Sequence, residues 1–346
     1  MSENSFESAT LWTHGKDGYS LFHVFGLIAA KDTVLAFAEG RHGGKDAGEA
    51  HDIVMRRSTD GGKTFAESVC LFGGERCLTN PTPIYDTCTG RVLLFFAENH
   101  ENARTVLYLS HSDDLGTSWS VPQDVTHLIT EKSDVQFHLP GPSHGIQLQK
   151  SPHTGRLLLQ LWHRGPSVRI PREERGYCVS LLYSDDHGEH WTHVPPLAAE
   201  VFANESALCE TDDGVLWTLR SFGTQHAMTK SRDGGVTWDT VRVMPLPPAF
   251  ACEAGLISLP NPQISAKTVL LSRISRPEKE NRRDMEICIS RDGGNTFPAR
   301  LALPEGDAYP GYSELCALDG GKAVGVLHCH EGRVLFTRIS ADALPR

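Results

Sequence analysis

The chain has 346 residues, of which 39% are hydrophobic, with a formal net charge of −10 and a pI of about 5.9. The acidic balance argues against nucleic acid or an anionic membrane as a partner, because both favour a basic face. No apolar stretch reaches membrane-spanning length, and no basic region followed by an apolar segment opens the chain. Nine cysteines without regular close spacing are typical of reduced thiols, so we expect a cytoplasmic protein. A secreted protein without its leader is the alternative, which free thiols disfavour.

Short apolar or alternating runs, each typical of a β-strand, recur along the chain. They cover residues 34–39, 52–58, 91–98, 105–112, 156–163 and 268–274. Turn-forming residues separate them, and no long stretch keeps the helical period of about 3.6 residues. We therefore expect an all-β protein with little helix.

A box of the form S-x-D-x-G-x-x-[W/F] occurs five times. The copies read STDGGKTF, SDDLGTSW, SDDHGEHW, SRDGGVTW and SRDGGNTF, and they begin at Ser58, Ser112, Ser184, Ser231 and Ser290. The aspartate can accept hydrogen bonds from backbone N–H groups of its own turn, and the glycine tolerates a positive φ. The aromatic residue can fold back and pin the hairpin to the sheet below. Five copies indicate a repeated supersecondary unit.

The spacing of the boxes predicts the architecture. Intervals of ~50 to 70 residues leave room for a four-stranded blade around each box. Five boxes plus one degenerate blade predict a six-bladed β-propeller that occupies residues 1–346 as a single domain, with five or seven blades as the alternatives. The run at 333–340 is expected to join N-terminal strands and close the ring. Because the boxes belong to the scaffold, a site is expected on loops at the opposite end, around the central axis.

Four segments outside the boxes hold residues that could carry chemistry. They are residues 37–52 with Asp46, residues 202–210 with Glu205 and the following Arg220, residues 277–290 with Arg282 and Arg283, and residues 309–315 with Tyr312. Taken singly, each has an ordinary explanation, because loop carboxylates and arginines are usually solvated and a lone tyrosine usually packs.

In combination and in this order, the segments resemble a known family. The five boxes, AFAEGR (36–41), GPSHGIQL (141–148), NES, RRDMEICIS and GYSEL resemble the sialidase (neuraminidase) superfamily from about residue 18 to 340. The resemblance implies an exo-acting, retaining glycoside hydrolase on a six-bladed propeller. Its partner would be a sialylated oligosaccharide or glycoconjugate, and it would need no cofactor.

The resemblance also implies roles for individual residues. Tyr312 matches the nucleophile, Glu205 the glutamate paired with it, and Asp46 the acid/base. Arg220 and Arg282 match two of the three arginines that bind the substrate carboxylate. This chemistry is sound, because a carboxylate nucleophile would be repelled by the carboxylate on the anomeric carbon, whereas a neutral tyrosine is not. Guanidinium forks suit carboxylate geometry.

The chain departs from the family pattern at one place. The first carboxylate-binding arginine usually stands in a Phe/Tyr-Arg-Ile-Pro segment one strand before AFAE, and here that segment reads FHVFGLI (22–28). His23 could replace the arginine as a hydrogen-bond donor or a charge, or Arg41 could supply the cation. A third explanation is a propeller that binds sugar without cleaving it, and a scaffold for protein partners is a further alternative. Arg283 is the alternative to Arg282 if the register differs by one residue.

Signatures of other chemistry are missing from the sequence. No Walker motif or GxGxxG follows a strand, and there is no HExxH helix motif or CxxC pair. We therefore expect neither a metal nor a cofactor.

Overall fold

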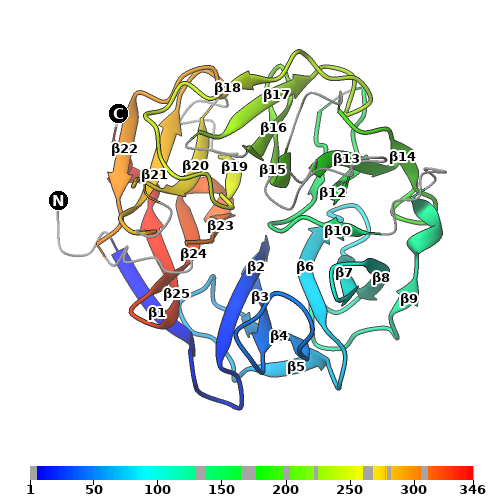
Figure 1. Ribbon diagram of the computed structural model, residues 1–346. Helices are drawn as coiled ribbons and strands as arrows, with labels where there is room; N and C mark the ends of the chain where they lie inside the picture. The colour runs from blue at the N-terminus through cyan, green and yellow to red at the C-terminus, as the bar shows by residue number, and fades with distance from the viewer. Residues whose placement is uncertain are drawn as a thin grey trace.

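The computed structural model describes residues 6–129, 137–150, 152–164, 177–197, 203–221, 225–259, 268–276, 278, 282–304 and 311–345. In this part of the chain the apolar runs form the strands of six antiparallel sheets, which are arranged as blades around a central axis (Figure 1). The predicted strand boundaries agree with the observed ones to within two residues. The six-bladed, all-β architecture predicted from the boxes is confirmed.

The first three blades follow the chain in order. Blade 1 contains β2 (Leu21–Ala30), β3 (Thr33–Arg41), β4 (His51–Ser58) and β5 (Val69–Phe72). Blade 2 contains β6 (Leu78–Tyr85), β7 (Val92–His100), β8 (Arg104–Ser112) and β9 (Gln123–Asp124). Blade 3 contains β10 (His138–Pro140), β11 (Ile146–Gln147), β12 (Leu157–Arg164), β13 (Tyr177–Ser184) and β14 (Thr192–Val194), and both β10 and β11 pair with β12.

The remaining blades complete the ring. Blade 4 contains β15 (Ala203–Thr211), β16 (Gly214–Ser221), β17 (Ala227–Ser231) and β18 (Arg242–Val243). Blade 5 contains β19 (Leu256–Ser258), β20 (Val269–Ile274), β21 (Met285–Ser290) and β22 (Ala299–Ala302). Blade 6 contains β23 (Ser313–Leu318), β24 (Ala323–His330), β25 (Arg333–Ser340) and β1 (Phe6–Thr13).

Helix is confined to three short 3₁₀ turns in the described residues. They are η1 (Thr126–Leu128), η3 (Asp319–Gly321) and η4 (Ala341–Ala343). None of them has the length and apolar character that crossing a membrane requires.

The two ends of the chain close the ring. β1 is the outer strand of blade 6 and pairs with β25, from Phe6 opposite Ile339 to Thr13 opposite Arg333 (Figure 1). The predicted closure by residues 333–340 is therefore confirmed. Blade 6 is the one blade without a box among the described residues, as the sequence predicted. Each box links the last two strands of blades 1 to 5, whereas the outer strand of blade 6 comes from the other end of the chain.

Each box is a turn that satisfies its own backbone. In the first box, Ser58 Oγ donates to Asp60 Oδ1 at 2.7 Å and accepts the Gly62 N–H at 2.9 Å. Asp60 Oδ1 also accepts the N–H groups of Lys63 and Thr64, both at 3.0 Å. The serine–aspartate bond and the serine–glycine bond recur in the other four boxes.

The box glycine packs directly on the preceding blade. A Cβ on Gly62 would lie 2.4 Å from the Phe336 ring, and the other box glycines would meet leucines of the preceding blade in the same way. These pairs are Gly116 with Leu35, Gly188 with Leu93, Gly235 with Leu181 and Leu158, and Gly294 with Leu216. The box thus needs glycine for its positive φ and also for close packing between blades.

Three box aromatics contact the preceding blade, as the sequence predicted. Phe65 packs on Phe336 at 5.0 Å, Trp119 on Phe37 at 5.9 Å and Trp191 on Phe95 at 5.1 Å between ring centroids. Trp238 instead packs on Trp217 of its own blade at 4.8 Å.

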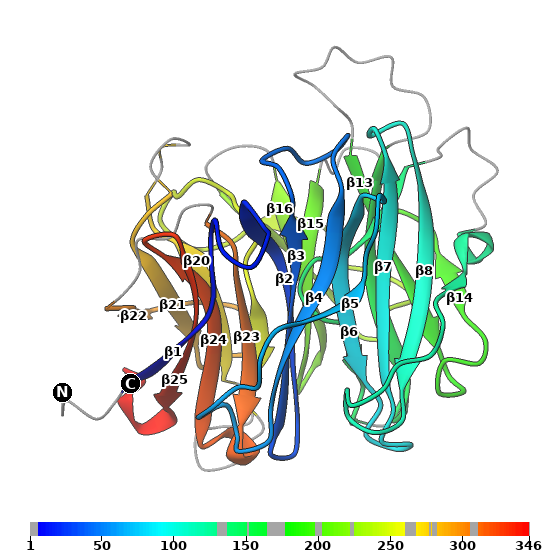
Figure 2. The same ribbon diagram turned by 90° about the horizontal axis from the view of Figure 1, so that it is seen from below.

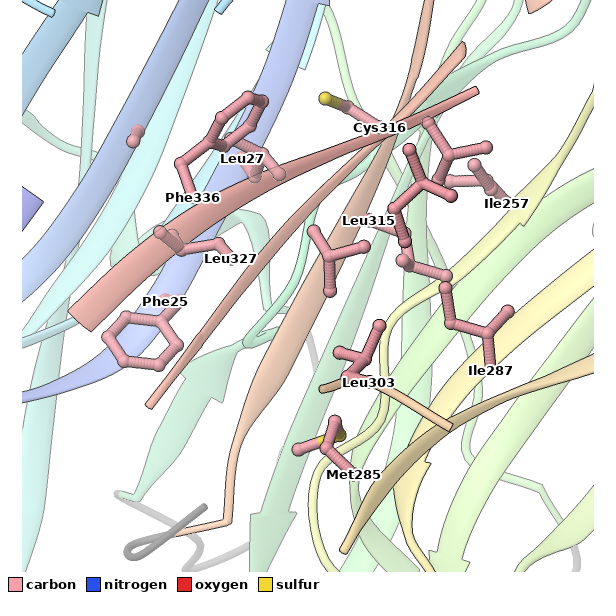
Figure 3. Close-up of a cluster of buried hydrophobic side chains, with 14 of the residues drawn as sticks. Phe25, Leu27, Ile257, Met285, Ile287, Leu303, Leu315, Cys316, Leu327 and Phe336 are labelled. Carbon is pink, nitrogen blue, oxygen red and sulfur yellow. The ribbon is translucent and has the colours of Figure 1, made fainter. Parts of the chain in front are cut away.

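Hydrophobic side chains fill the space between blades. Figure 3 shows the cluster where blades 1, 5 and 6 meet, with Phe25 and Leu27 of β2, Leu315 of β23 and Phe336 of β25. All of these side chains are buried, and every residue of β3 is buried as well. Seen from the side, the strands run between the two ends of the ring, so loops gather at both ends (Figure 2).

Gly61 and Gly62 are neighbours in the first box, and substituting each one separates the need for a positive φ from the need for close packing between blades. Gly61→Ala should cost ~1 kcal/mol, because it introduces only left-handed strain at a site with ordinary contacts. Gly62→Ala should cost ~1–3 kcal/mol more, because the methyl group also overlaps the Phe336 ring. Urea unfolding of both variants checks this, and equal losses would show that interblade packing is not what Gly62 provides.

Candidate active site

A cavity of about 580 Å³ opens at one end of the ring, on the central axis. Side chains from blades 1, 2, 3, 4 and 6 and from the segment before β21 line it. Seven of the eight predicted site residues are among them, namely His23, Arg41, Asp46, Glu205, Arg220, Arg282 and Tyr312. Arg283, the alternative to Arg282, is exposed and is not among the lining residues that the structure describes.

Bulges in three inner strands face the cavity. The pairing register shifts between His23 and Phe25 in β2, between Thr79 and Thr82 in β6, and between Ala203 and Ser206 in β15. Val24 and Asn80 adopt positive φ at two of these bulges. Bulges of this kind redirect side chains next to sites, and here Val24, Asn80, Asn204 and Glu205 line the cavity.

Tyr312, Glu205 and Arg220 form one hydrogen-bonded group. The Tyr312 hydroxyl donates to Glu205 Oε1, and Arg220 Nη1 donates to Glu205 Oε2. Arg220 Nη1 also lies 3.1 Å from the Tyr312 oxygen, and its Nε donates to the Ala251 carbonyl at 3.0 Å. Residues 107 positions apart in sequence are thereby joined at the base of the cavity.

Burial and charge fix the protonation of this group. Burial, together with the Glu205 carboxylate, raises the pKa of Tyr312 well above its usual value, so the phenol is neutral at rest. Burial opposes the charge on Arg220, but the Glu205 carboxylate outweighs it and the pKa of Arg220 stays well above its usual value. The result is a neutral tyrosine between a carboxylate and a permanent cation.

Arg41 is fully engaged by two carboxylates. Its Nε donates to Glu39 Oε2 at 2.8 Å, and its Nη1 donates to Asp46 Oδ1 at 2.6 Å. Glu39 is completely buried and also accepts the Thr79 hydroxyl and the Asn80 N–H. The side chain of Asp46, by contrast, is 84% exposed. Arg41 therefore connects a buried carboxylate to the exposed aspartate at the cavity mouth.

His51 helps to hold the loop that carries Asp46. Its Nε2 donates to the Lys45 carbonyl at 3.0 Å, which leaves Nδ1 to accept the Cys77 thiol at 3.5 Å. Burial raises the pKa of Cys77 to about 12, so the thiol keeps its proton. Asn99 Nδ2 adds a bond to the Asp46 carbonyl at 3.5 Å.

His23 lies against Tyr312 as a neutral ring. Its ring centroid is 4.2 Å from that of Tyr312, and its buried Nδ1 has no hydrogen-bond partner among the described residues. Burial and the charges of Arg41 and Arg282 hold the pKa of His23 well below its usual value. His23 therefore does not supply the charge of the missing arginine.

Arg282 reaches the cavity from the segment before β21. Its guanidinium lies 5.2 Å from the Phe250 ring centroid, and Nη1 is 3.8 Å from Cys252 Sγ. Gly311, beside Tyr312, packs against the Arg282 stem.

Several residues of the site were missed in the sequence. Glu39 directly follows the apolar residues 34–38, and a glutamate at the end of such a strand was the signal in the sequence for a buried charge. Asn80 and Asn204 gave no signal in the sequence, because only the bulges turn them inward.

Glu253 was also missed. It is buried, and its Oε2 accepts the N–H of Ser313, next to the predicted nucleophile, at 3.0 Å. Burial and the nearby Glu314 and Glu205 raise the pKa of Glu253 well above its usual value, so it is protonated at neutral pH.

One segment has the letters of a serine hydrolase motif but not its structure. Residues 141–145, GPSHG, fit GxSxG. Ser143 is completely buried, however, and strands β10 and β11 flank it instead of a strand and a helix. A nucleophile elbow requires an exposed serine at a strand-to-helix turn, so this segment is structural.

Replacing His23 by glutamine should make stability less sensitive to acid. The folded protein keeps His23 neutral, whereas in the unfolded chain its pKa is near ~6.5. Below that pH the unfolded state binds one more proton, so the free energy of unfolding falls by ~1.4 kcal/mol per pH unit for this residue. The stability that depends on a neutral His23 is intact above ~pH 6.5, and it is lost as the pH falls toward the pKa of His23 in the folded protein.

Urea unfolding between ~pH 7 and ~pH 5 checks this, and the pH slope of His23→Gln should be smaller by up to one proton. His190→Gln is the control, because His190 is 91% exposed, and it should keep the wild-type slope. Identical slopes in all three proteins would mean that His23 gains a proton without unfolding.

The chain is similar to known proteins over most of its length. Residues 32–328 match the family model described as a BNR repeat-like domain. A sialidase from Micromonospora viridifaciens is 27% identical over 344 residues, covering 92% of this chain and 51% of the relative. A sialidase from Bacteroides fragilis is 29% identical over 348 residues, covering 91% of this chain and 61% of the relative. The chain thus spans between about half and three fifths of these relatives' lengths.

Solved structures share the fold across nearly the whole chain. The Hadza microbial sialidase Hz136 has a TM-score of 0.85 at 26% identity, covering 98% of this chain and 69% of that one. The intramolecular trans-sialidase from Ruminococcus gnavus has a TM-score of 0.80 at 19% identity, covering 97% of this chain and 98% of that one. Because the family match runs from blade 1 into blade 6, the chain belongs to the BNR repeat-like domain family, within the sialidase superfamily.

Proposed function

We propose that the protein is an exo-acting, retaining sialidase that removes terminal sialic acids from oligosaccharides or glycoconjugates. The observation that carries the proposal is the Tyr312–Glu205–Arg220 group in the axial cavity. A cavity of about 580 Å³ lies within the range of small-ligand sites. Membership in the sialidase superfamily adds support.

Tyr312 is proposed to attack the anomeric carbon. As its oxygen forms the bond to that carbon, its proton passes to Glu205, to which it is already hydrogen-bonded. The raised pKa of Tyr312 keeps the phenol neutral until this moment, so the anionic sugar can approach without repulsion. Arg220, within hydrogen-bond distance of both partners, stabilises the negative charge that shifts between them.

Asp46 is proposed as the acid/base at the cavity mouth. It protonates the leaving oxygen as the glycosidic bond breaks, and it then takes a proton from the water that cleaves the tyrosyl intermediate. Asp46 Oδ1 lies 2.6 Å from Arg41 Nη1, so Asp46 must move away from Arg41 to reach the leaving oxygen. Its position on an exposed loop gives it that freedom.

Arg220 and Arg282 are proposed to hold the substrate carboxylate. Arg220 Nη2 has no hydrogen-bond partner among the described residues, and Arg220 lines the same cavity as Arg282. Arg41 is a poor substitute for the missing arginine, because Glu39 and Asp46 already occupy its donors. The charge-assisted hydrogen bonds between one arginine and the substrate carboxylate contribute ~1.5–3 kcal/mol. Their loss weakens ground-state binding of the substrate by ~10- to 150-fold.

The engagement of Arg41 and the neutrality of His23 favour a second candidate, a propeller that binds a sialylated sugar without cleaving it. Release of the fluorophore from an aryl sialoside by the purified protein separates the two functions. Turnover supports the hydrolase, whereas binding without turnover supports the lectin-like alternative.

Tyr312→Phe should lower kcat by about 10³-fold or more on a sialoside whose leaving group needs acid assistance, because no oxygen remains to bond the anomeric carbon. Tyr183→Phe is the matched control. Tyr183 packs under Arg156 outside the cavity lining, and this change should leave kcat unchanged. Near-normal kcat in Tyr312→Phe would remove Tyr312 from the nucleophile role.

The first-formed product should keep the anomeric configuration of the substrate, because a tyrosyl intermediate requires two displacements. Proton NMR at early times, before the sugar mutarotates, reads the configuration directly. It also distinguishes a free sialic acid from an intramolecular anhydro product, which identifies hydrolysis or transfer. An inverted product would indicate direct attack by water and would contradict the covalent role of Tyr312.

A further inference from the structure

A second group of chemically reactive side chains lies far from the cavity. Asp86 and Cys88 belong to the turn between β6 and β7, and His187 belongs to the box of blade 3. One ligand atom of each residue lies within 4.8 Å of those of the other two. β6 begins beside Glu39 at the cavity and ends just before Asp86. An eight-residue strand at ~3.3 Å per residue separates the two sites by more than 20 Å.

The turn at residues 86–90 holds Asp86 and Cys88 in place. The Gly90 N–H donates to the Asp86 carbonyl at 2.8 Å, and the Cys88 N–H donates to Asp86 Oδ1 at 2.9 Å. Gln147 of β11 donates through Nε2 to Asp86 Oδ1, and this nitrogen lies 3.6 Å from Cys88 Sγ. Asp86 is completely buried, whereas Cys88 is exposed. The carboxylate and the thiol are thus oriented before any ligand arrives.

His187 completes the group from the neighbouring blade. It occupies the variable position before the box glycine, which is Gly61, Leu115, Gly234 and Gly293 in the other boxes. It adopts a positive φ of 62°, and its Nδ1 lies 2.9 Å from Asp86 Oδ2. Its side chain is 43% exposed. A histidine at this position of the box therefore reaches across the gap between blades 2 and 3.

We propose that Asp86, Cys88 and His187 bind a divalent transition-metal ion of the zinc class. Carboxylate oxygen, thiolate sulfur and imidazole nitrogen are the three ligand types of zinc sites, and calcium or magnesium would avoid the sulfur and nitrogen. Bonds of ~2.0–2.3 Å in a tetrahedron place neighbouring ligand atoms ~3.3–3.6 Å apart. The most distant ligand atoms, within 4.8 Å of each other, would therefore approach by up to ~1.5 Å, and His187 Nδ1 would move slightly away from Asp86 Oδ2, from which it lies 2.9 Å. Water can fill the fourth position, because two of the ligands are exposed.

Metal binding would release the proton of the Cys88 thiol, because the thiolate is the ligand, so affinity rises with pH. The neutral His187 ring would bind through the nitrogen that carries no proton, with its N–H on the other nitrogen. Gln147, bonded to Asp86 and close to Cys88, is placed to orient these ligands. The site is too distant from Tyr312 for catalysis and would join blade 2 to blade 3.

Cobalt titration of the tag-free protein after treatment with a chelator tests the proposal. Co²⁺ should bind with one ion per chain and give a thiolate-to-cobalt charge-transfer band, which Zn²⁺ should remove by displacement. Cys88→Ser should abolish the band, and His187→Gln should weaken cobalt affinity at least ~10-fold. At the same zinc concentration, the Tm of the wild type should rise more than that of either variant.

Two matched variants control for adventitious binding. Cys70→Ser removes another exposed cysteine, and His190→Gln removes an exposed histidine of the same box, so both should retain the band and the affinity. Tm in chelator shows whether each variant is folded. A band that persists in Cys88→Ser, an affinity unchanged in His187→Gln, or no binding by the folded wild type would overturn the proposal.

Discussion

The pairing of β1 with β25 is the contact that turns six separate sheets into a closed ring. In that ring each blade packs against the next: every box glycine, and the box aromatics of blades 1 to 3, rest on apolar side chains of the preceding blade. Without closure, blade 6 would lose its outer strand and expose an unpaired edge next to β25. The inner strands converge on one axis because the ring is complete, and the cavity lies on that axis.

Charged groups at the cavity are arranged in mutually compensating pairs. Glu205 is compensated by Arg220, and buried Glu39 by Arg41, while Glu253 keeps a proton instead of a partner cation. An uncompensated buried charge would be costly. These pairs allow the inner strands to carry polar side chains on faces that are otherwise apolar, and the bulges aim them toward the axis.

His23 stands where the family pattern has an arginine, and as a neutral ring it adds no charge to blade 1. It is tilted against the ring of Tyr312, and the cation beside Glu39 is Arg41 of the same strand β3. Arg41 in turn binds Asp46, which couples the buried carboxylate to the loop at the cavity mouth.

The sequence by itself determined the elements that depend on local chemistry. Serine, aspartate and glycine at fixed offsets specify the box turns, alternating apolar runs specify the strands, and five boxes at blade spacing specify the propeller. The family resemblance identified Tyr312, Glu205 and Arg282 as site residues, and all three line one cavity.

Only the tertiary structure decided which distant groups meet. The inward turn of Asn80 and Asn204 depends on bulges, and the neutrality of His23 depends on burial among arginines. Two constraints require glycine in the box, and only one of them is local. The positive φ is a property of the turn, whereas the absence of a Cβ is required because side chains of the preceding blade lie too close. Propensity and spacing act over a few residues, whereas the protonation and partners of buried groups are set by neighbours that the closed ring alone brings together.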